Sequence, residues 1–135
     1  MQNYFQELNN KIKKKKVKIS IFGIGYVGIK LVLALAKKNC SISCFDKDIE
    51  KIKKISKGVS PFSYISNKEI KDVKKNLIFY NDIKKVRDTD VIIMCLPTPL
   101  YKGKPDLSHI KNCWDQIKKY IKRGQLIILE STTYP

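Results

Sequence analysis

Three glycines have the type and spacing that dinucleotide binding requires. Gly23, Gly25 and Gly28 follow an apolar segment at residues 17–22 and open a second apolar segment that runs to about residue 38. Between a strand and a helix, the first glycine permits a tight turn, the second lets backbone approach a pyrophosphate, and the third brings helix and sheet together. The helix start offers free N–H groups and a positive dipole end. The pattern predicts pyrophosphate binding at Gly23-Ile24-Gly25-Tyr26-Val27-Gly28.

A carboxylate at the end of the next apolar segment supports this interpretation. Asp46 follows residues 41–45 and lies 18 residues after Gly28, near the spacing of about 20 residues for an acid that accepts hydrogen bonds from a ribose diol. An anion at this position disfavours a 2′-phosphate, because two unit charges about 4 Å apart repel by about 4 kcal/mol at an effective dielectric of 20. We therefore predict NAD, rather than NADP, as the cofactor.

The elements that must position these residues alternate along the chain. Apolar runs suited to buried parallel strands recur between helical patterns and turns, at residues 17–22, 41–45, 77–80, 91–96 and 126–129. Ser66 and Glu69 have the spacing of a capping box, and Asp106 precedes a one-sided helical pattern that it can cap. With right-handed crossovers, this succession predicts an α/β fold: a doubly wound, Rossmann-type parallel sheet in strand order 3-2-1-4-5.

In such a sheet, the ligand crevice lies beyond the carboxyl ends of the strands, where the strand order reverses. The glycine turn and Asp46 follow the first two strands, and two polar segments follow the last two, Pro97-Thr98-Pro99 and Ser131-Thr132. We therefore expect all four to converge at one crevice.

The length, charge and composition of the chain argue against some classes of function. The chain has 135 residues, which suits one domain, and a formal net charge of +16. Its lysines are spread along every expected helix without interleaved aromatic residues, so we favour a solvated basic surface and expect no nucleic-acid partner; a basic nucleic-acid-binding protein remains an alternative. Long apolar runs are absent and the first residues are polar, so we expect no membrane partner and no signal peptide.

The cysteines suggest a reducing compartment. Cys40, Cys44, Cys95 and Cys113 show no paired metal-ligand spacing, and we expect them to be reduced thiols of a cytoplasmic protein without a metal site.

Five motifs occur in register along the chain: Gly23-Ile24-Gly25-Tyr26-Val27-Gly28, Phe45-Asp46-Lys47-Asp48, Cys95-Leu96-Pro97-Thr98-Pro99-Leu100, Pro105-Asp106-Leu107-Ser108 and Glu130-Ser131-Thr132-Thr133-Tyr134-Pro135. Together they resemble one known family, the nucleotide-sugar 6-dehydrogenases (the UDP-glucose/GDP-mannose dehydrogenase family), in their N-terminal NAD-binding domain. The last of these motifs and a loop at residues 60–66 most resemble the UDP-N-acetylglucosamine 6-dehydrogenase branch, which serves bacterial surface-polysaccharide synthesis.

The resemblance implies an NAD-dependent oxidoreductase that converts the C6 alcohol of a UDP-sugar, in particular a UDP-N-acetylhexosamine, to a carboxylate. It implies that residues 23–28 hold the pyrophosphate, that Asp46 holds the adenosine ribose, and that Lys51 lies over the adenosine end. Further roles follow by position: Pro97 and Thr98 line the ribose and nicotinamide side, Ser131 contacts the cofactor, and Thr132 positions water or a proton relay at the reaction centre. Ile29-Lys30 stands where the family commonly has Leu-Pro, a favourable but dispensable proline at the first helical turn.

The resemblance also implies that the chain is a fragment. We expect a basic leader at residues 1–16 and a truncated Rossmann domain at residues 17–135, incomplete on its C-terminal side. The family's catalytic cysteine, its partners, most sugar-binding residues and the C-terminal domain correspond to sequence beyond residue 135. We therefore expect the chain alone to be inactive and homo-oligomers only in a full-length form. A non-catalytic nucleotide-binding module remains the main alternative.

Overall fold

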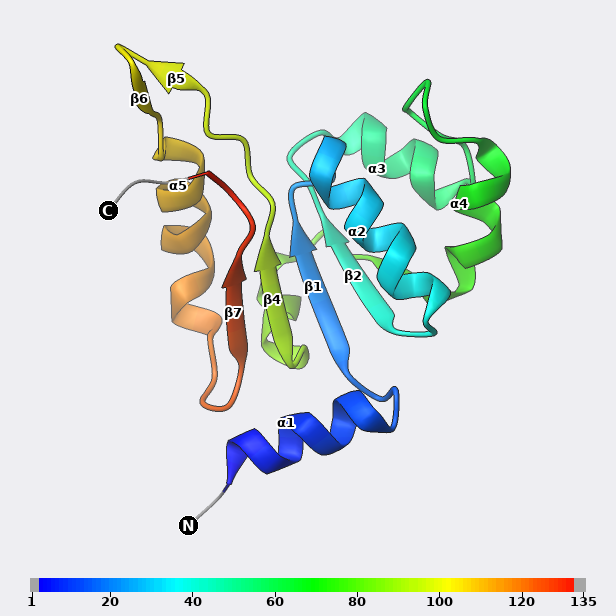
Figure 1. Cartoon of the computed structure of the whole chain (residues 1–135), viewed down its shortest axis with the longest axis vertical. Coiled ribbons are helices and arrows are strands. Elements are labelled where there is room, and N and C mark those ends of the chain that lie inside the picture. The colour runs from blue at the N-terminus through cyan, green and yellow to red at the C-terminus, as the bar shows by residue number, and fades with distance from the viewer. Residues whose placement is uncertain (1–2, 133–135) are drawn as a thin grey trace.

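A five-stranded parallel sheet with helices on both faces forms the centre of the computed structural model, which describes residues 3–132 (Figure 1). The strand order is β3-β2-β1-β4-β7, so the predicted doubly wound sheet and its order are confirmed. The elements in chain order are α1 (Tyr4–Lys13), β1 (Lys18–Phe22), α2 (Tyr26–Lys37), β2 (Ser41–Phe45), α3 (Ile49–Ser56), α4 (Asn67–Val73), η1 (Lys74–Asn76), β3 (Leu77–Phe79), η2 (Ile83–Asp88), β4 (Val91–Met94), β5 (Leu100–Tyr101), β6 (Lys104–Pro105), α5 (Ser108–Ile117), η3 (Lys118–Tyr120) and β7 (Leu126–Leu129).

The central strands are apolar because both of their faces are covered. β1 lies between β2 and β4, and Ile21 of β1 and Ile92 of β4 are fully buried on opposite faces of the sheet. Helix α2 packs on one face through Ile29 and Val32, whereas α5 contributes Ile117 to the other. Burial on two sides explains the continuous apolar runs from which the strands were predicted.

Local signals set the helix boundaries largely as expected. Ser66 accepts a hydrogen bond from the backbone N–H of Glu69, whose side chain bonds back to Ser66, so the capping box of α4 is confirmed. Helix α5 differs slightly, because its N-cap is Leu107 rather than Asp106. Asp106 still accepts the backbone N–H of Ser108, at 2.9 Å, and satisfies the helix start from one position further out.

The connection after β4 holds a hairpin that the sequence pattern did not predict. Strand β4 ends at Met94, two residues before the end of its apolar run. The chain then forms the antiparallel pair β5–β6, in which Lys102 and Gly103 both have positive φ. Two successive positive φ angles are typical of the turns that close two-residue hairpins. The hairpin extends beyond the carboxyl ends of the strands (Figure 1).

Helix α1 closes the opposite end of the sheet, where the strands begin (Figure 1). Its Leu8 packs against the core, and its Lys11 forms an ion pair with Asp90, just before β4. The ring of Tyr4 lies against Gly124, just before β7. The expected leader is therefore helical from residue 4 and is attached to the sheet. No helix in the described part of the chain is long and apolar enough to cross a membrane.

Candidate functional site

The turn after β1 is held against the neighbouring strand end. Gly23 has φ +89°, and a Cβ atom there would lie 2.5 Å from the carbonyl oxygen of Cys95. The backbone N–H of Gly23 donates to Phe45, and that of Cys95 donates to Phe22. Only glycine fits both this conformation and this space. The turn is therefore fixed by the ends of β2 and β4, one on each side.

The other two glycines differ in the space that a side chain would find. A Cβ at Gly28 would lie 1.9 Å from the carbonyl oxygen of Gly23, whereas a Cβ at Gly25 would meet no atom within 4 Å. Gly28 therefore permits α2 to approach the turn, and Gly25 leaves open space in front of the helix start. Gly25 is also the N-cap, and its lack of a side chain leaves the start of α2 without a side-chain cap.

The start of α2 consequently presents backbone donors to the open side of Gly25. The first helical bond runs from the N–H of Ile29 to the carbonyl of Gly25, so the N–H groups of Tyr26, Val27 and Gly28 precede the helical ladder. These donors and the positive end of the helix dipole suit a pyrophosphate. The structure places residues 23–28 together in the geometry that this chemistry needs.

Asp46 lies beside the turn, and its carboxylate accepts hydrogen bonds from the protein that the sequence did not suggest. Its Oδ2 accepts the backbone N–H of Ile24 at 2.7 Å and Nζ of Lys51 at 3.1 Å, and its Oδ1 accepts the N–H of Asp48 at 2.8 Å. The side chain of Asp46 is 8% exposed. A carboxylate has about four acceptor positions, so about one remains on Oδ1 for a ribose hydroxyl. Lys51 is placed at this carboxylate, next to the expected adenosine end.

The ends of β4 and β7 bring in the remaining predicted residues. Ser131 donates its hydroxyl to the carbonyl of Leu96 at 2.8 Å, which joins the two strand ends. Thr98 is half-buried, whereas Pro97 and Thr132 are exposed. The convergence that topology predicted is therefore present: residues after β1, β2, β4 and β7 meet at one end of the sheet. Thr133 to Pro135 lie outside the described residues.

A tyrosine–lysine pair at the rim of the site was not predicted. Nζ of Lys30 lies 3.0 Å from the hydroxyl of Tyr26 and 4.1 Å from the centre of its ring. The hydrogen bond and positive charge of Lys30 lower the pKa of Tyr26 from its usual value. Tyr64 packs edge-on against Tyr26, with 5.6 Å between ring centres. The four-residue spacing of Tyr26 and Lys30 on a helix was the signal available in the sequence.

Burial raises the pKa of three of the four thiols, and of these Cys95 follows β4 beside the glycine turn. Burial raises the pKa of Cys44 to about 12. Burial, and then the charge of Glu130, raise the pKa of Cys95 to about 11. Burial likewise raises the pKa of Cys113 to about 11. Because a thiolate is the nucleophilic form, none of these cysteines is prepared for covalent catalysis at neutral pH.

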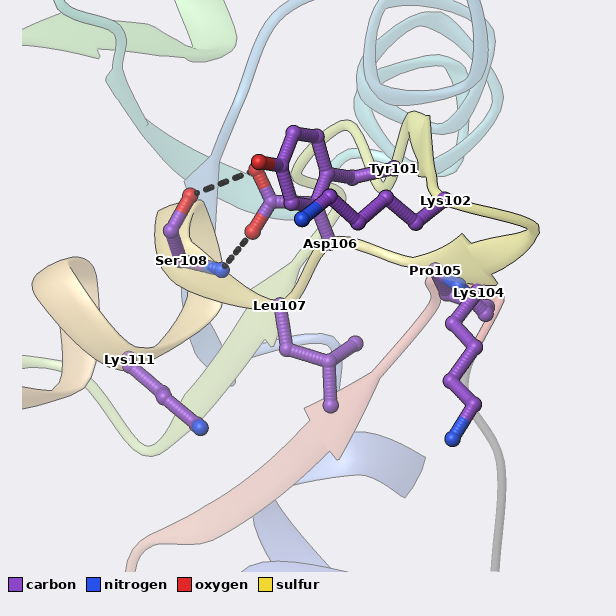
Figure 2. Close-up of a pocket in the computed structure, with 8 residues that line it drawn as sticks. All are labelled: Tyr101, Lys102, Lys104, Pro105, Asp106, Leu107, Ser108 and Lys111. Carbon is purple, nitrogen blue, oxygen red and sulfur yellow. Dashed lines mark hydrogen bonds between the residues drawn. The ribbon is translucent and has the colours of Figure 1, made fainter.

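A hollow of about 510 Å³ lies between the hairpin and the start of α5 (Figure 2). Its one carboxylate, Asp106, points to Ser108, whose N–H and hydroxyl donate to it at 2.9 and 3.0 Å. These bonds lower the pKa of Asp106. The remaining charged side chains there are lysines, so the hollow suits an anion. Among residues 3–132, no group of His, Cys, Asp and Glu is arranged to hold a metal ion. The lining residues are Tyr101, Lys102, Lys104, Pro105, Asp106, Leu107, Ser108 and Lys111.

Comparison with known sequences points to one family. The sequence model of the UDP-glucose/GDP-mannose dehydrogenase family, NAD binding domain, matches residues 17–135. The UDP-N-acetyl-D-glucosamine 6-dehydrogenase of Pseudomonas aeruginosa is 30% identical over 122 residues, which cover 90% of this chain and 28% of that protein. The UDP-N-acetyl-D-mannosamine dehydrogenase of Pyrococcus horikoshii is 31% identical over 125 residues, which cover 88% of this chain and 29% of that protein.

Solved structures give the same result. The chain superposes on a ternary complex of GDP-mannose dehydrogenase from Pseudomonas aeruginosa with a TM-score of 0.80 and 30% identity, over 87% of this chain and 29% of that one. An NDP-N-acetyl-D-galactosaminuronic acid dehydrogenase from Methanosarcina mazei gives a TM-score of 0.82 and 26% identity, over 100% of this chain and 31% of that one. The chain thus spans less than a third of the length of these relatives.

Proposed function

The chain belongs to the UDP-glucose/GDP-mannose dehydrogenase family, and from this membership we propose that it is the NAD-binding part of a nucleotide-sugar 6-dehydrogenase. The family domain that it matches is an NAD-binding Rossmann domain of an oxidoreductase. The observation that carries the proposal is the uncapped start of α2 in front of Gly25, with Asp46 beside it.

The residues present fit NAD. The N–H groups of Tyr26, Val27 and Gly28 would hold the pyrophosphate, and the remaining acceptor position of Asp46 would take a hydroxyl of the adenosine ribose. Lys51 would keep that carboxylate in place through its 3.1 Å contact. NAD, when bound, supplies the two-electron oxidant.

The other strand ends would receive the nicotinamide side of the cofactor. Pro97 and Thr98 follow β4 at the same end of the sheet, and Ser131 holds the two strand ends together through the carbonyl of Leu96. Thr132 is exposed next to Ser131 and is our candidate for positioning water or a proton at the reaction centre.

For the substrate, we propose a UDP-N-acetylhexosamine whose C6 alcohol becomes a carboxylate for surface-polysaccharide synthesis. The names of the relatives in Pseudomonas aeruginosa and Pyrococcus horikoshii, each at least 30% identical to this chain, support this substrate class. We assign residues 17–135 to the NAD-binding domain, because the family model matches this range, and residues 1–16 to the leader. Four free cysteines among the described residues support a cytoplasmic protein.

We further propose that this chain alone does not turn over sugar. Oxidation of an alcohol through an aldehyde to an acid requires a base and, in this family, a thiolate that traps the aldehyde. The thiol at the crevice is Cys95, whose pKa of about 11 leaves little thiolate. The same fact favours the second candidate function, a non-catalytic nucleotide-binding module.

Two measurements on the purified chain test these proposals. Calorimetric titration with NAD should show binding that Gly25→Ala weakens, and absence of binding by the folded chain would contradict the NAD-binding role. A mixture with NAD and UDP-N-acetylhexosamines should produce no NADH. Sustained turnover in material free of contaminating enzyme would contradict the proposed inactivity. Extension of the reading frame past residue 135 separates the two candidate functions, because a downstream catalytic cysteine would favour the enzyme.

A further inference from the structure

The fold gathers basic side chains that are scattered in the sequence. All five strands of the main sheet run parallel, so the connections that lead into them lie at one end of the sheet, opposite the carboxyl ends of the strands (Figure 1). These connections, at residues 13–17, 37–40, 74–76, 84–90 and 118–125, contain fifteen of the 28 basic residues and two of the twelve acidic ones. We call this surface the basic end. It carries most of the net charge of +16.

Little of this charge is neutralised within the molecule. Among residues 3–132, Lys85 and Lys118 are the basic-end lysines that form ion pairs, with Asp88 at 3.9 Å and Asp115 at 2.7 Å. One of the two acids of the basic end, Asp90, is already paired with Lys11 of α1 and accepts the backbone N–H of Lys18. The four consecutive lysines at 13–16 are all exposed. The acids of the basic end are therefore too few to neutralise its lysines.

Helix α1 adds exposed apolar side chains to the same surface. Leu8 and Lys11 hold one side of α1 to the sheet. Phe5 and Ile12, two turns apart, lie on the flank of the helix and are 77% and 49% exposed. Exposed apolar residues on a helix that a run of lysines follows, here at residues 13–16, are typical of segments that lie in the interface of a membrane.

We propose that the basic end is a docking surface for a membrane rich in anionic lipids. Lysines at 13–16 would face the headgroups, while Phe5 and Ile12 would enter the boundary between headgroups and acyl chains. The carboxyl ends of the strands, where we propose that NAD binds, lie at the other end of the sheet (Figure 1). This inference does not depend on the proposed enzymatic function.

The proposal replaces the sequence-based expectation of a solvated surface without a membrane partner. The expectation of a solvated surface used the distribution of lysines along the expected helices, whereas the parallel topology brings the loop lysines together. The expectation of no membrane partner used the absence of long apolar runs, and a protein without such runs can still bind a membrane surface. A nucleic acid would also attract the lysines, but its phosphates leave Phe5 and Ile12 without a role. Exposed Phe and Ile beside the lysines favour a lipid surface.

Sedimentation of the full chain with vesicles tests the proposal. We expect binding to vesicles containing about one third phosphatidylglycerol, no binding to pure phosphatidylcholine, and release at about 1 M salt, where the Debye length is about 3 Å. Absence of binding to the anionic vesicles would overturn the proposal. A short DNA duplex that binds at equal salt more tightly than these vesicles would also overturn it.

Variants with equal charge change locate the surface. Replacing Lys13, Lys14 and Lys16 with Gln should weaken vesicle binding by about a hundredfold, because each lysine near an anionic surface contributes a factor of about five. The matched control replaces Lys102, Lys104 and Lys111, which lie around the hairpin hollow at the opposite end, and should change binding less than about threefold. Equal losses in the two variants would overturn the location. The pair Phe5→Ser and Ile12→Ser should weaken binding while its salt dependence remains. Unchanged melting temperatures verify that each variant is folded.

Discussion

The two ends of the sheet carry out different kinds of recognition with different parts of the chain. At the crevice, backbones are in close contact, because Gly28 packs directly against the carbonyl of Gly23. The carboxylate of Asp46 there accepts three hydrogen bonds, and its side chain is 8% exposed. At the basic end, the lysines are exposed, and most of them form no ion pair among the described residues. The crevice therefore depends on the position of each atom, whereas the basic end depends on summed charge. Substitutions at the two ends should therefore differ in their effects on stability and binding.

The largest effect is expected where backbone contacts leave no space. Gly28→Ala places a Cβ 1.9 Å from the carbonyl oxygen of Gly23. Alanine should add about 1 kcal/mol of helix propensity, but overpacking against backbone costs about 3 kcal/mol or more. We expect a net loss of about 2 kcal/mol or more, a melting temperature lower by about 8 °C, and no NAD binding.

Gly25→Ala is the matched control, because the same methyl group meets no atom within 4 Å. Its melting temperature should stay within about 2 °C of the parent. NAD should bind about tenfold more weakly, since the methyl group enters the space proposed for the pyrophosphate. Similar melting temperatures for the two variants would contradict the contact between α2 and the turn.

Thiol reactivity provides the next largest effect. Burial raises the pKa of Cys95 from 9.0 to about 11, so its thiolate fraction at pH 8 should be about a hundredfold lower than that of an exposed cysteine. Alkylation by iodoacetamide, followed by mass spectrometry of the Cys95 peptide, should therefore be slow at pH 8. Because the thiol loses its proton as pH rises, the rate should climb until about pH 11. Rapid alkylation at pH 7 in the folded chain would contradict this.

Cofactor preference should change by a smaller factor. Lys51 lies 3.1 Å from Asp46 and offsets part of the repulsion between that carboxylate and a 2′-phosphate. Lys51→Met should raise the preference for NAD over NADP by about tenfold, or about 1.4 kcal/mol. Asp46→Ala should abolish the preference. Fluorescence titration with both cofactors measures each ratio, and an unchanged ratio in Asp46→Ala would count against the assignment of the ribose site.

The basic end should tolerate the loss of the ion pair that joins its Asp90 to Lys11 of α1. Lys11 is half-exposed, and exposed ion pairs contribute about 0–1 kcal/mol, so Lys11→Met should lower the melting temperature by less than about 4 °C. Asp90→Ala should cost more, because it also removes the acceptor for the N–H of Lys18. If Lys11→Met were as damaging as Gly28→Ala, the contrast between the two ends would fail.

The sequence predicted the features that arise from periodicity and topology. Continuous apolar runs identified the five strands, and the parallel order then brought residue 23, Asp46 and Ser131 to one end without knowledge of any contact. The hairpin β5–β6 was missed, because two-residue strands have no periodic signal. The three donors to Asp46 were missed as well, since they depend on side-chain and backbone placement within about 3 Å.

The clustering of charge could not be recognised by inspecting the chain one segment at a time. Lys13 and Lys122 are more than a hundred residues apart, yet both precede strands of the same parallel sheet. When basic residues are counted helix by helix, their distribution looks even, and the cluster is not visible. Assignment of each loop to one end of the predicted sheet identifies the basic end from the sequence alone.

The parallel order of the strands also has a consequence for the rate of folding. No two neighbouring strands of the main sheet are joined by a hairpin, and β1 pairs with β4 across a far longer stretch of chain than with β2, as the partners Ile19–Val91 and Lys18–Ser41 show. Closing the longer loop costs about 1 kcal/mol more. We expect β1, α2 and β2 to form first and β4 to join later, in a slow step. Pulse-labelled hydrogen exchange should show protection of β2 before β4, so the crevice, which needs both, becomes complete only at the end of folding.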